Sequence, residues 1–244
     1  MVEEEDGVEV KLVYGVGDVD KKFLFSDDGN IMENIVSYLT TCYKYVKAGH
    51  TFAFIVDMKS WPKEVVNIQK IMKKVMQWHV TVQRSMYADF LDFARTYEKD
   101  VELTLKDCEE VEERVVIDTD FFKSRLARNT IRLRMHTDFN MDREFFLEWS
   151  SGLEVERLID FDLIRERIRM HGGDCYSNLH IDLRHVAGWE FDMEVLCPSD
   201  QFEVEYDDDE ERYRKYQIGQ YVRAEIWSNG KRLYLSFRDK EEDE

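Results

Sequence analysis

The longest regular pattern of apolar and polar residues spans residues 31–79 and predicts a helix, a strand and a second helix. Between Ile31 and Val46, apolar residues recur at the three- and four-residue spacing of an amphipathic helix. Residues 52–56 are apolar at every position, so we expect a strand that is covered on both faces in a parallel or mixed sheet. A second amphipathic helix is expected after Pro62.

The rest of the chain is richer in strand patterns. Alternation of apolar and polar residues, which is typical of half-exposed strands, is clearest after residue 127. Strands are predicted at 8–14, 23–25, 79–82, 101–105, 115–118, 131–139, 179–183, 189–195 and 202–206. A hairpin is predicted at 221–237 around Asn229-Gly230, and helices are predicted at 87–96 and within the segments 145–149 and 158–169.

These elements predict an α+β fold. We expect residues 1–126 to form a three-layer α/β unit with a mixed sheet. Residues 127–244 are expected to form an antiparallel, β-rich unit that packs on the first. We detect no internal sequence repeat.

Composition narrows the functional classes. The 244 residues are 43% hydrophobic, as in a folded protein, and the four cysteines form no CxxC pair. The chain starts without a signal-peptide pattern, and no apolar stretch approaches the ~18 residues of a membrane span, so we expect a cytoplasmic protein. The formal net charge of −18 disfavours direct binding to nucleic-acid phosphates and fits a basic protein partner.

Two places in the chain carry candidate site residues. Asp57 and Lys59 follow the apolar strand 52–56, at the end where α/β sheets commonly bind ligands, and are candidates for a polar head group. His180 and Asp182 are two residues apart on a predicted strand, so both face one side and are candidate metal ligands. Alternatively, Cys175 is a nucleophile with His180 as its base. We predict no bound cofactor.

Four short motifs lie in the central unit, and they are Ser37-Tyr38-Leu39, Gly49-His50-Thr51-Phe52, Ile55-Val56-Asp57-Met58-Lys59-Ser60-Trp61 and His79-Val80, with the helix at 65–76 between the last two. Through these motifs the unit resembles the CRAL-TRIO lipid-binding fold, in the version found at the head of the Rho exchange factors Trio and kalirin. The resemblance covers residues 8–120 and implies a pocket for a phosphoinositide or other lipid, with Phe52, Phe54, Asp57 and Lys59 as ligand-binding residues. Residues 80–85 depart from it, because they are too polar for the wall of a lipid cavity.

Three functions follow from these observations. The first is a non-enzymatic scaffold or binding module that engages a protein partner and a lipid. The second is an acidic structural or assembly protein, of viral type, that docks on a basic partner. The third is an enzyme that depends on a metal or a cysteine near His180.

Overall fold

The computed structural model describes residues 7–13, 20–26, 37, 41, 52–56, 61, 76–157, 159–170, 177–184, 191, 202–206, 214–218, 222–226 and 231–237. Two strands, β1 (Gly7–Val13) and β2 (Asp20–Ser26), pair antiparallel as a small separate sheet. All other described strands belong to one sheet.

The main sheet contains ten strands in the order β3-β4-β5-β6-β7-β8-β12-β11-β10-β9. The first six are β3 (Phe52–Val56), β4 (Met76–Val82), β5 (Val101–Asp107), β6 (Thr130–His136), β7 (Gly152–Val155) and β8 (Ser177–Asp182), and they pair in parallel. The last four are β9 (Phe202–Tyr206), β10 (Arg214–Ile218), β11 (Val222–Ile226) and β12 (Arg232–Phe237), and they pair antiparallel. The direction changes where β8 meets β12.

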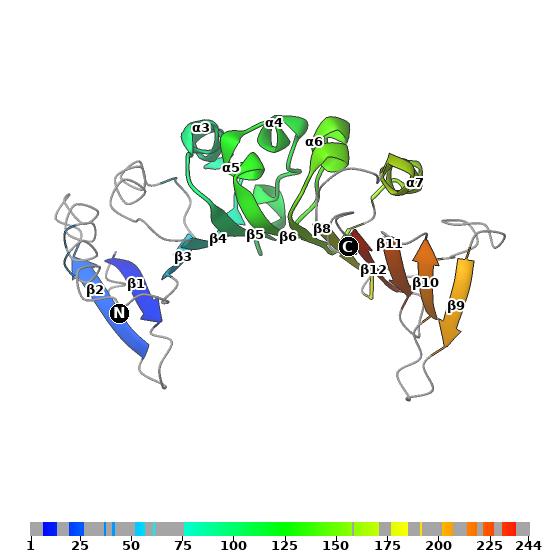
Figure 1. Cartoon of the computed structure of the whole chain (residues 1–244). Coiled ribbons are helices and arrows are strands. Elements are labelled where there is room, and N and C mark those ends of the chain that lie inside the picture. Colours follow the sequence, from blue (N-terminus) through cyan, green and yellow to red (C-terminus); the bar gives the residue numbers. More distant parts are fainter. Residues whose placement is uncertain are drawn as a thin grey trace.

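Helices cover one face of this sheet. They are α3 (Tyr87–Thr96), α4 (Thr119–Phe122), α5 (Arg125–Arg128), α6 (Arg143–Glu148) and α7 (Phe161–Met170), with a 3-10 turn η1 (Val111–Glu113). Figure 1 shows helices α3–α7 on the same side, while the sheet bends away from them towards both of its ends. No helix in the described part of the chain is long and apolar enough to cross a membrane.

The parallel strands follow one another in chain order, as in a solenoid. Their first residues, at 52, 76, 101, 130, 152 and 177, lie 24, 25, 29, 22 and 25 residues apart. One strand with a helical return every 20 to 29 residues or so is the arrangement of horseshoe-shaped repeat proteins. Such proteins stack their repeats on a shared core and leave the strand face open.

The core consists of apolar side chains that repeat from strand to strand in register. Leu103 of β5 pairs with Leu133 of β6, and the row continues across β7, β8 and β12. All five leucines are at most 1% exposed, and they are Leu103, Leu133, Leu153, Leu179 and Leu235. A second buried row, two residues further along, is Val80, Leu105, Met135, Val155, Ile181 and Leu233.

Aromatic rings fill the space between this core and the first helices. Phe90 of α3 stacks on Phe121 of α4 at 5.8 Å between ring centroids, and Trp61 lies 5.1 Å from Phe90. Asp118 caps α4, where its carboxylate accepts hydrogen bonds from the backbone N–H groups of Asp120 and Phe121. The short helices α4 and α5 are therefore held by packing and caps rather than by length.

Much of the predicted pattern is confirmed. The α+β class with a mixed sheet is present, and the predicted strands 52–56 and 202–206 and helix 87–96 have the observed bounds. The C-terminal pair β11–β12 is antiparallel as expected. Most of residues 31–46 and 62–75, predicted as helices, and the predicted strand 189–195 apart from Phe191 lie outside the described residues, so these elements stay predictions.

Two expectations need correction. Ile55 in β3 is 61% exposed, so the strand 52–56 is not covered on both faces. In the second half, strands β6, β7 and β8 pair in parallel rather than antiparallel. Their alternation of apolar and polar residues comes from a parallel sheet on which the described helices lie on one face (Figure 1). The sheet continues across residue 127, where β5 pairs with β6, and the division into two units at this point stays a prediction.

Candidate functional site: the open face of the sheet

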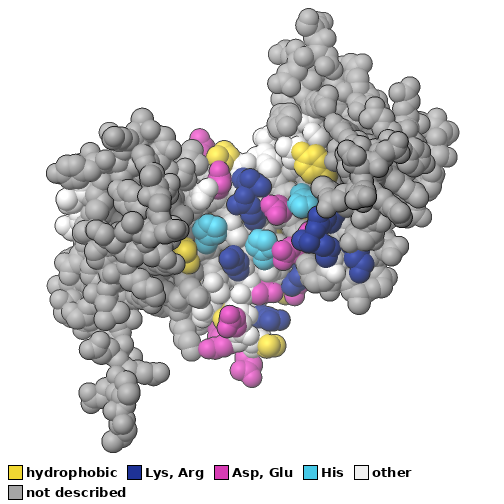
Figure 2. Space-filling view, turned by 90° about the horizontal axis from the view of Figure 1, so that it is seen from below, with side chains coloured by type: hydrophobic (Ala, Val, Ile, Leu, Met, Phe, Trp, Pro, Cys, Tyr) yellow, Lys and Arg dark blue, Asp and Glu magenta, His cyan; other side chains and the backbone are white. Residues whose placement is uncertain are grey.

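The face opposite the helices carries rows of polar side chains. Each strand from β4 to β8, and then β12, places alternate residues on this open face, and the register aligns them across the sheet. The middle row is His79, Thr104, Arg134, Glu154, His180 and Tyr234. Figure 2 looks onto this face and shows histidine, basic and acidic side chains together at its centre.

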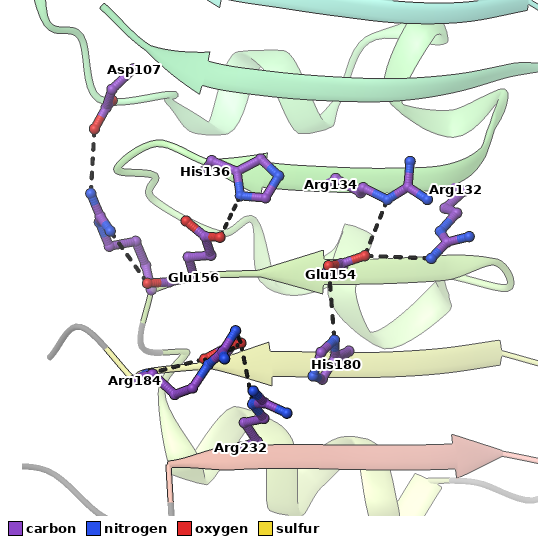
Figure 3. Close-up of polar contacts among 11 residues, drawn as sticks. Asp107, Arg132, Arg134, His136, Glu154, Glu156, His180, Arg184 and Arg232 are labelled. Atoms are coloured by element: carbon purple, nitrogen blue, oxygen red, sulfur yellow. Dashed lines mark hydrogen bonds and ion pairs between the residues drawn. The ribbon is translucent and has the colours of Figure 1, made fainter. Parts of the chain in front are cut away.

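Glu154 is at the centre of one group of contacts on the open face. One of its carboxylate oxygens accepts from Arg134 Nε at 3.1 Å and lies 3.5 Å from Arg132 Nη2 (Figure 3). The other oxygen is 3.9 Å from Nδ1 of His180. Because β7 lies between β6 and β8, a single carboxylate reaches cationic or imidazole groups on both sides.

A second group of ion pairs lies at the carboxyl ends of the strands. His136 Nδ1 is 2.7 Å from the carboxylate of Glu156. Asp182 is 2.8 Å from Arg184 and 3.5 Å from Arg232. Alternating charges across neighbouring strands hold one another in place, so the side chains of the open face are positioned before any ligand arrives.

A pocket of about 650 Å³ opens in this face above Gly152. The glycine has no side chain between Arg132 of β6 and Asn178 of β8, its neighbours in the register. The pocket is lined by Ile131, Arg132, Ser150, Ser151, Gly152, Leu153, Glu154, Ser177, Asn178, His180 and Tyr234. The Tyr234 hydroxyl donates a hydrogen bond to the side-chain oxygen Oδ1 of Asn178 at 2.8 Å, which leaves the side-chain NH₂ group of Asn178 to serve as a donor.

Burial and neighbouring charges shift the pKa values of two histidines and one aspartate on this face. Burial lowers the pKa of His180 below 6.5, and the carboxylates of Glu154 and Asp182 oppose this only in part. Burial also lowers the pKa of His79, and the positive charges of Lys106 and Arg134 lower it further. Burial raises the pKa of Asp182, but the hydrogen bonds and charge of Arg184 outweigh burial, and the net shift is downward.

These shifts predict that acid destabilises the fold in two steps. Both histidines bind protons less readily when folded than their ordinary pKa of 6.5 implies, so the unfolded chain binds more protons as the pH falls below 6.5. Asp182 adds a further loss below its ordinary pKa of 3.8. Urea unfolding across this pH range is the measurement, with the double variant His79→Gln and His180→Gln as the control.

In the double variant, the loss of unfolding free energy that begins below pH 6.5 should become smaller, and the loss below pH 3.8 should remain. An unfolding free energy that rises as the pH falls from 6.5 would contradict the assignment. So would an unchanged pH profile in the double variant.

Some of the predicted site residues lie in the described strands, and the others lie outside the described residues. His180 and Asp182 share one face of β8 as expected, but His180 contacts Glu154 while Asp182 pairs with Arg184 and Arg232. Within the described ranges no three His, Cys, Asp or Glu side chains are grouped as a metal ion would need. The backbone of Phe52 and Phe54 lies in β3, whereas Asp57, Lys59 and Cys175 lie outside the described residues.

Sequence reasoning missed the centre of the face. Gly152 and Glu154 belong to β7, which has only four residues and was not predicted as a strand. The available signal was the triplet Leu153-Glu154-Val155, a polar residue between two apolar ones.

Comparison with known proteins adds no relative. No protein-family model matches this chain, and neither a curated protein nor a solved structure is significantly similar to it. The resemblance to CRAL-TRIO domains therefore stays a prediction.

Proposed function

We propose that this chain is a non-enzymatic binding module whose open sheet face docks a protein partner. The observation that carries the proposal is the set of in-register polar rows on β4–β8 and β12, on the face opposite the helices. Solenoid proteins use surfaces of this kind for protein recognition. At ~4.8 Å between strands, six strands make a face about 24 Å wide, which can accommodate an extended segment or a helix of a partner.

The chemistry of the face favours a protein over a lipid as its ligand. Charged side chains occur in every strand from β5 to β8, and most of the residues around the pocket above Gly152 are polar, although the larger part of its lining surface is apolar. A lipid tail would have to desolvate these groups without replacing their hydrogen bonds. The backbone and side chains of a protein segment supply donors and acceptors for them.

Site-specific photo-cross-linking in cells of the source organism tests the proposal. A benzoylphenylalanine at Thr81 or at Arg132 on the open face should capture the same protein. The matched control places the photo-reactive residue at Glu144, which is exposed on α6 in the helical layer. Capture from Glu144 alone, or no capture from either open-face position, would show that the open face is not the docking surface.

A further inference from the structure

The charges of the open face are divided unevenly between its two halves. On β4–β6 three cations stand against one carboxylate, whereas on β7, β8 and β12, with the residues that follow β7 and β8, three carboxylates stand against two cations. The cations are Lys106, Arg132 and Arg134 in the first half and Arg184 and Arg232 in the second; the carboxylates are Glu102 in the first half and Glu154, Glu156 and Asp182 in the second. The β4–β6 half is therefore positive, although the chain as a whole has a formal net charge of −18.

The positive half is not fully neutralised by its own neighbours. Glu154 is shared between Arg132 and Arg134, so one negative charge serves two positive ones. Glu102 accepts a hydrogen bond from the side chain of Gln77 at 2.9 Å. Lys106 is exposed and makes no ion pair with any residue in the described ranges.

Thr104 lies among these cations. In the register it stands between His79 and Arg134, and it is two residues from Lys106 on the same face of β5. Its short side chain is only 4% exposed, so the longer neighbours surround it. A carboxylate above Thr104 would be about one strand spacing, ~4.8 Å, from groups on both adjacent strands.

We propose that the partner presents a segment rich in aspartate or glutamate to the β4–β6 half of the open face, with a carboxylate bound between Lys106 and Arg134 over Thr104. This inference rests on the proposed function and names the chemistry of the partner. Charge complementarity supports it, because Lys106 is exposed and the carboxylates of the second half already contact arginine or histidine side chains. The ammonium of Lys106 and the guanidinium of Arg134 supply the charged donors for that carboxylate.

Defined peptides test this proposal on the full chain. The probe is a fluorescent extended peptide of alternating threonine and glutamate, and glutamine or lysine replaces glutamate in two matched peptides. We expect the glutamate peptide to bind and the other two to bind at least about tenfold more weakly, which corresponds to 1.4 kcal/mol. Fluorescence anisotropy measures all three, and binding of the glutamate peptide should weaken as salt is added.

Charge reversal locates the binding position. Lys106→Glu should weaken binding of the glutamate peptide by about tenfold or more. The control Arg128→Glu reverses an exposed charge on α5 in the helical layer and should leave binding nearly unchanged. Both variants change the net charge of the protein by the same amount, so a difference between them reports a local contact at Lys106 and not the overall charge.

The outcomes separate this inference from the proposed function. Tighter binding of the lysine peptide, no binding of the glutamate peptide, or equal effects of Lys106→Glu and Arg128→Glu would each overturn the acidic-partner proposal. If cross-links still form from Thr81 and Arg132 in that case, docking on the open face stands and only the chemistry of the partner is wrong. Cross-links from Glu144 alone would overturn both.

Discussion

Replacing Arg167 with methionine is expected to lower the free energy of unfolding by about 3 kcal/mol. Arg167 is only 8% exposed, although it belongs to the otherwise highly charged helix α7. Its guanidinium donates to the backbone carbonyls of Leu147 and Trp149. These carbonyls lie at the C-terminal end of α6, where a cation also interacts favourably with the helix dipole.

The same side chain joins α7 to the sheet. Arg167 donates to the hydroxyl of Ser177 at the start of β8 at 3.2 Å, and its guanidinium carbon lies 5.2 Å from the centre of the Phe237 ring in β12. Methionine keeps the apolar stem but leaves the two buried carbonyls without these donors. Most of the expected loss therefore comes from unsatisfied backbone groups and not from lost volume.

Urea unfolding of three variants checks this prediction. Arg167→Lys should fall between Arg167→Met and the natural protein, since an ammonium lacks the planar set of donors that reaches both carbonyls. Arg169→Met, at an exposed position on the same helix, should change stability by no more than about 0.5 kcal/mol. Equal urea midpoints for Arg167→Met and Arg169→Met would show that the buried guanidinium does not stabilise the fold.

The local elements were predictable from the sequence because apolar periodicity reports burial. The helix Tyr87–Thr96 has the bounds that its periodicity predicts. The continuous apolar run Phe52–Val56 is a strand as predicted, but Ile55 within it is exposed. Strand β10, Arg214–Ile218, was missed, because its alternation consists of only two apolar side chains, Tyr216 and Ile218. Strands with so short a pattern are stabilised by their neighbours in the sheet, and this information lies outside the segment itself.

The topology was not predictable from the same signal. Alternating strands usually indicate an antiparallel sheet, because parallel sheets are commonly covered on both faces. Here the parallel strands alternate because the described helices all lie on one side of the sheet (Figure 1). The alternation reported correctly which residues are buried, but it carried no information about strand direction.

The repeat escaped detection because it consists of three residues at variable spacing. Each of five parallel strands contains a polar residue between two apolar ones, and the polar residue lies in the middle row of the open face. The triplets are Trp78-His79-Val80, Leu103-Thr104-Leu105, Leu133-Arg134-Met135, Leu153-Glu154-Val155 and Leu179-His180-Ile181. Intervals of 20 to 30 residues between successive triplets and a free choice of polar residue hide so short a motif. The fold requires only a polar residue at the middle position of each triplet. We therefore expect the choice of residue there to be set by function.

Replacing Gly152 with tyrosine is expected to abolish most of the partner binding while the fold is retained. A Cβ atom at this position would lie 3.4 Å from Cγ of Arg132 and 3.7 Å from the carbonyl oxygen of Ile131, both ordinary contacts. The tyrosine side chain would then extend over the floor of the pocket. A strand also accepts tyrosine more readily than glycine, so stability should not fall.

The measurement is the dissociation constant of the protein captured from Thr81, determined with the purified full chain and its variants. We expect Gly152→Tyr to weaken binding by at least about tenfold, or 1.4 kcal/mol, if a side chain of the partner enters the pocket. Gly152→Ala adds one methyl group to a pocket of about 650 Å³ and should have a small effect. Unchanged affinity in Gly152→Tyr, with an unchanged urea midpoint, would place the contact elsewhere on the open face. A loss of affinity in Gly152→Tyr but not in Gly152→Ala assigns the loss to occupied space, since both variants remove the same backbone freedom of glycine.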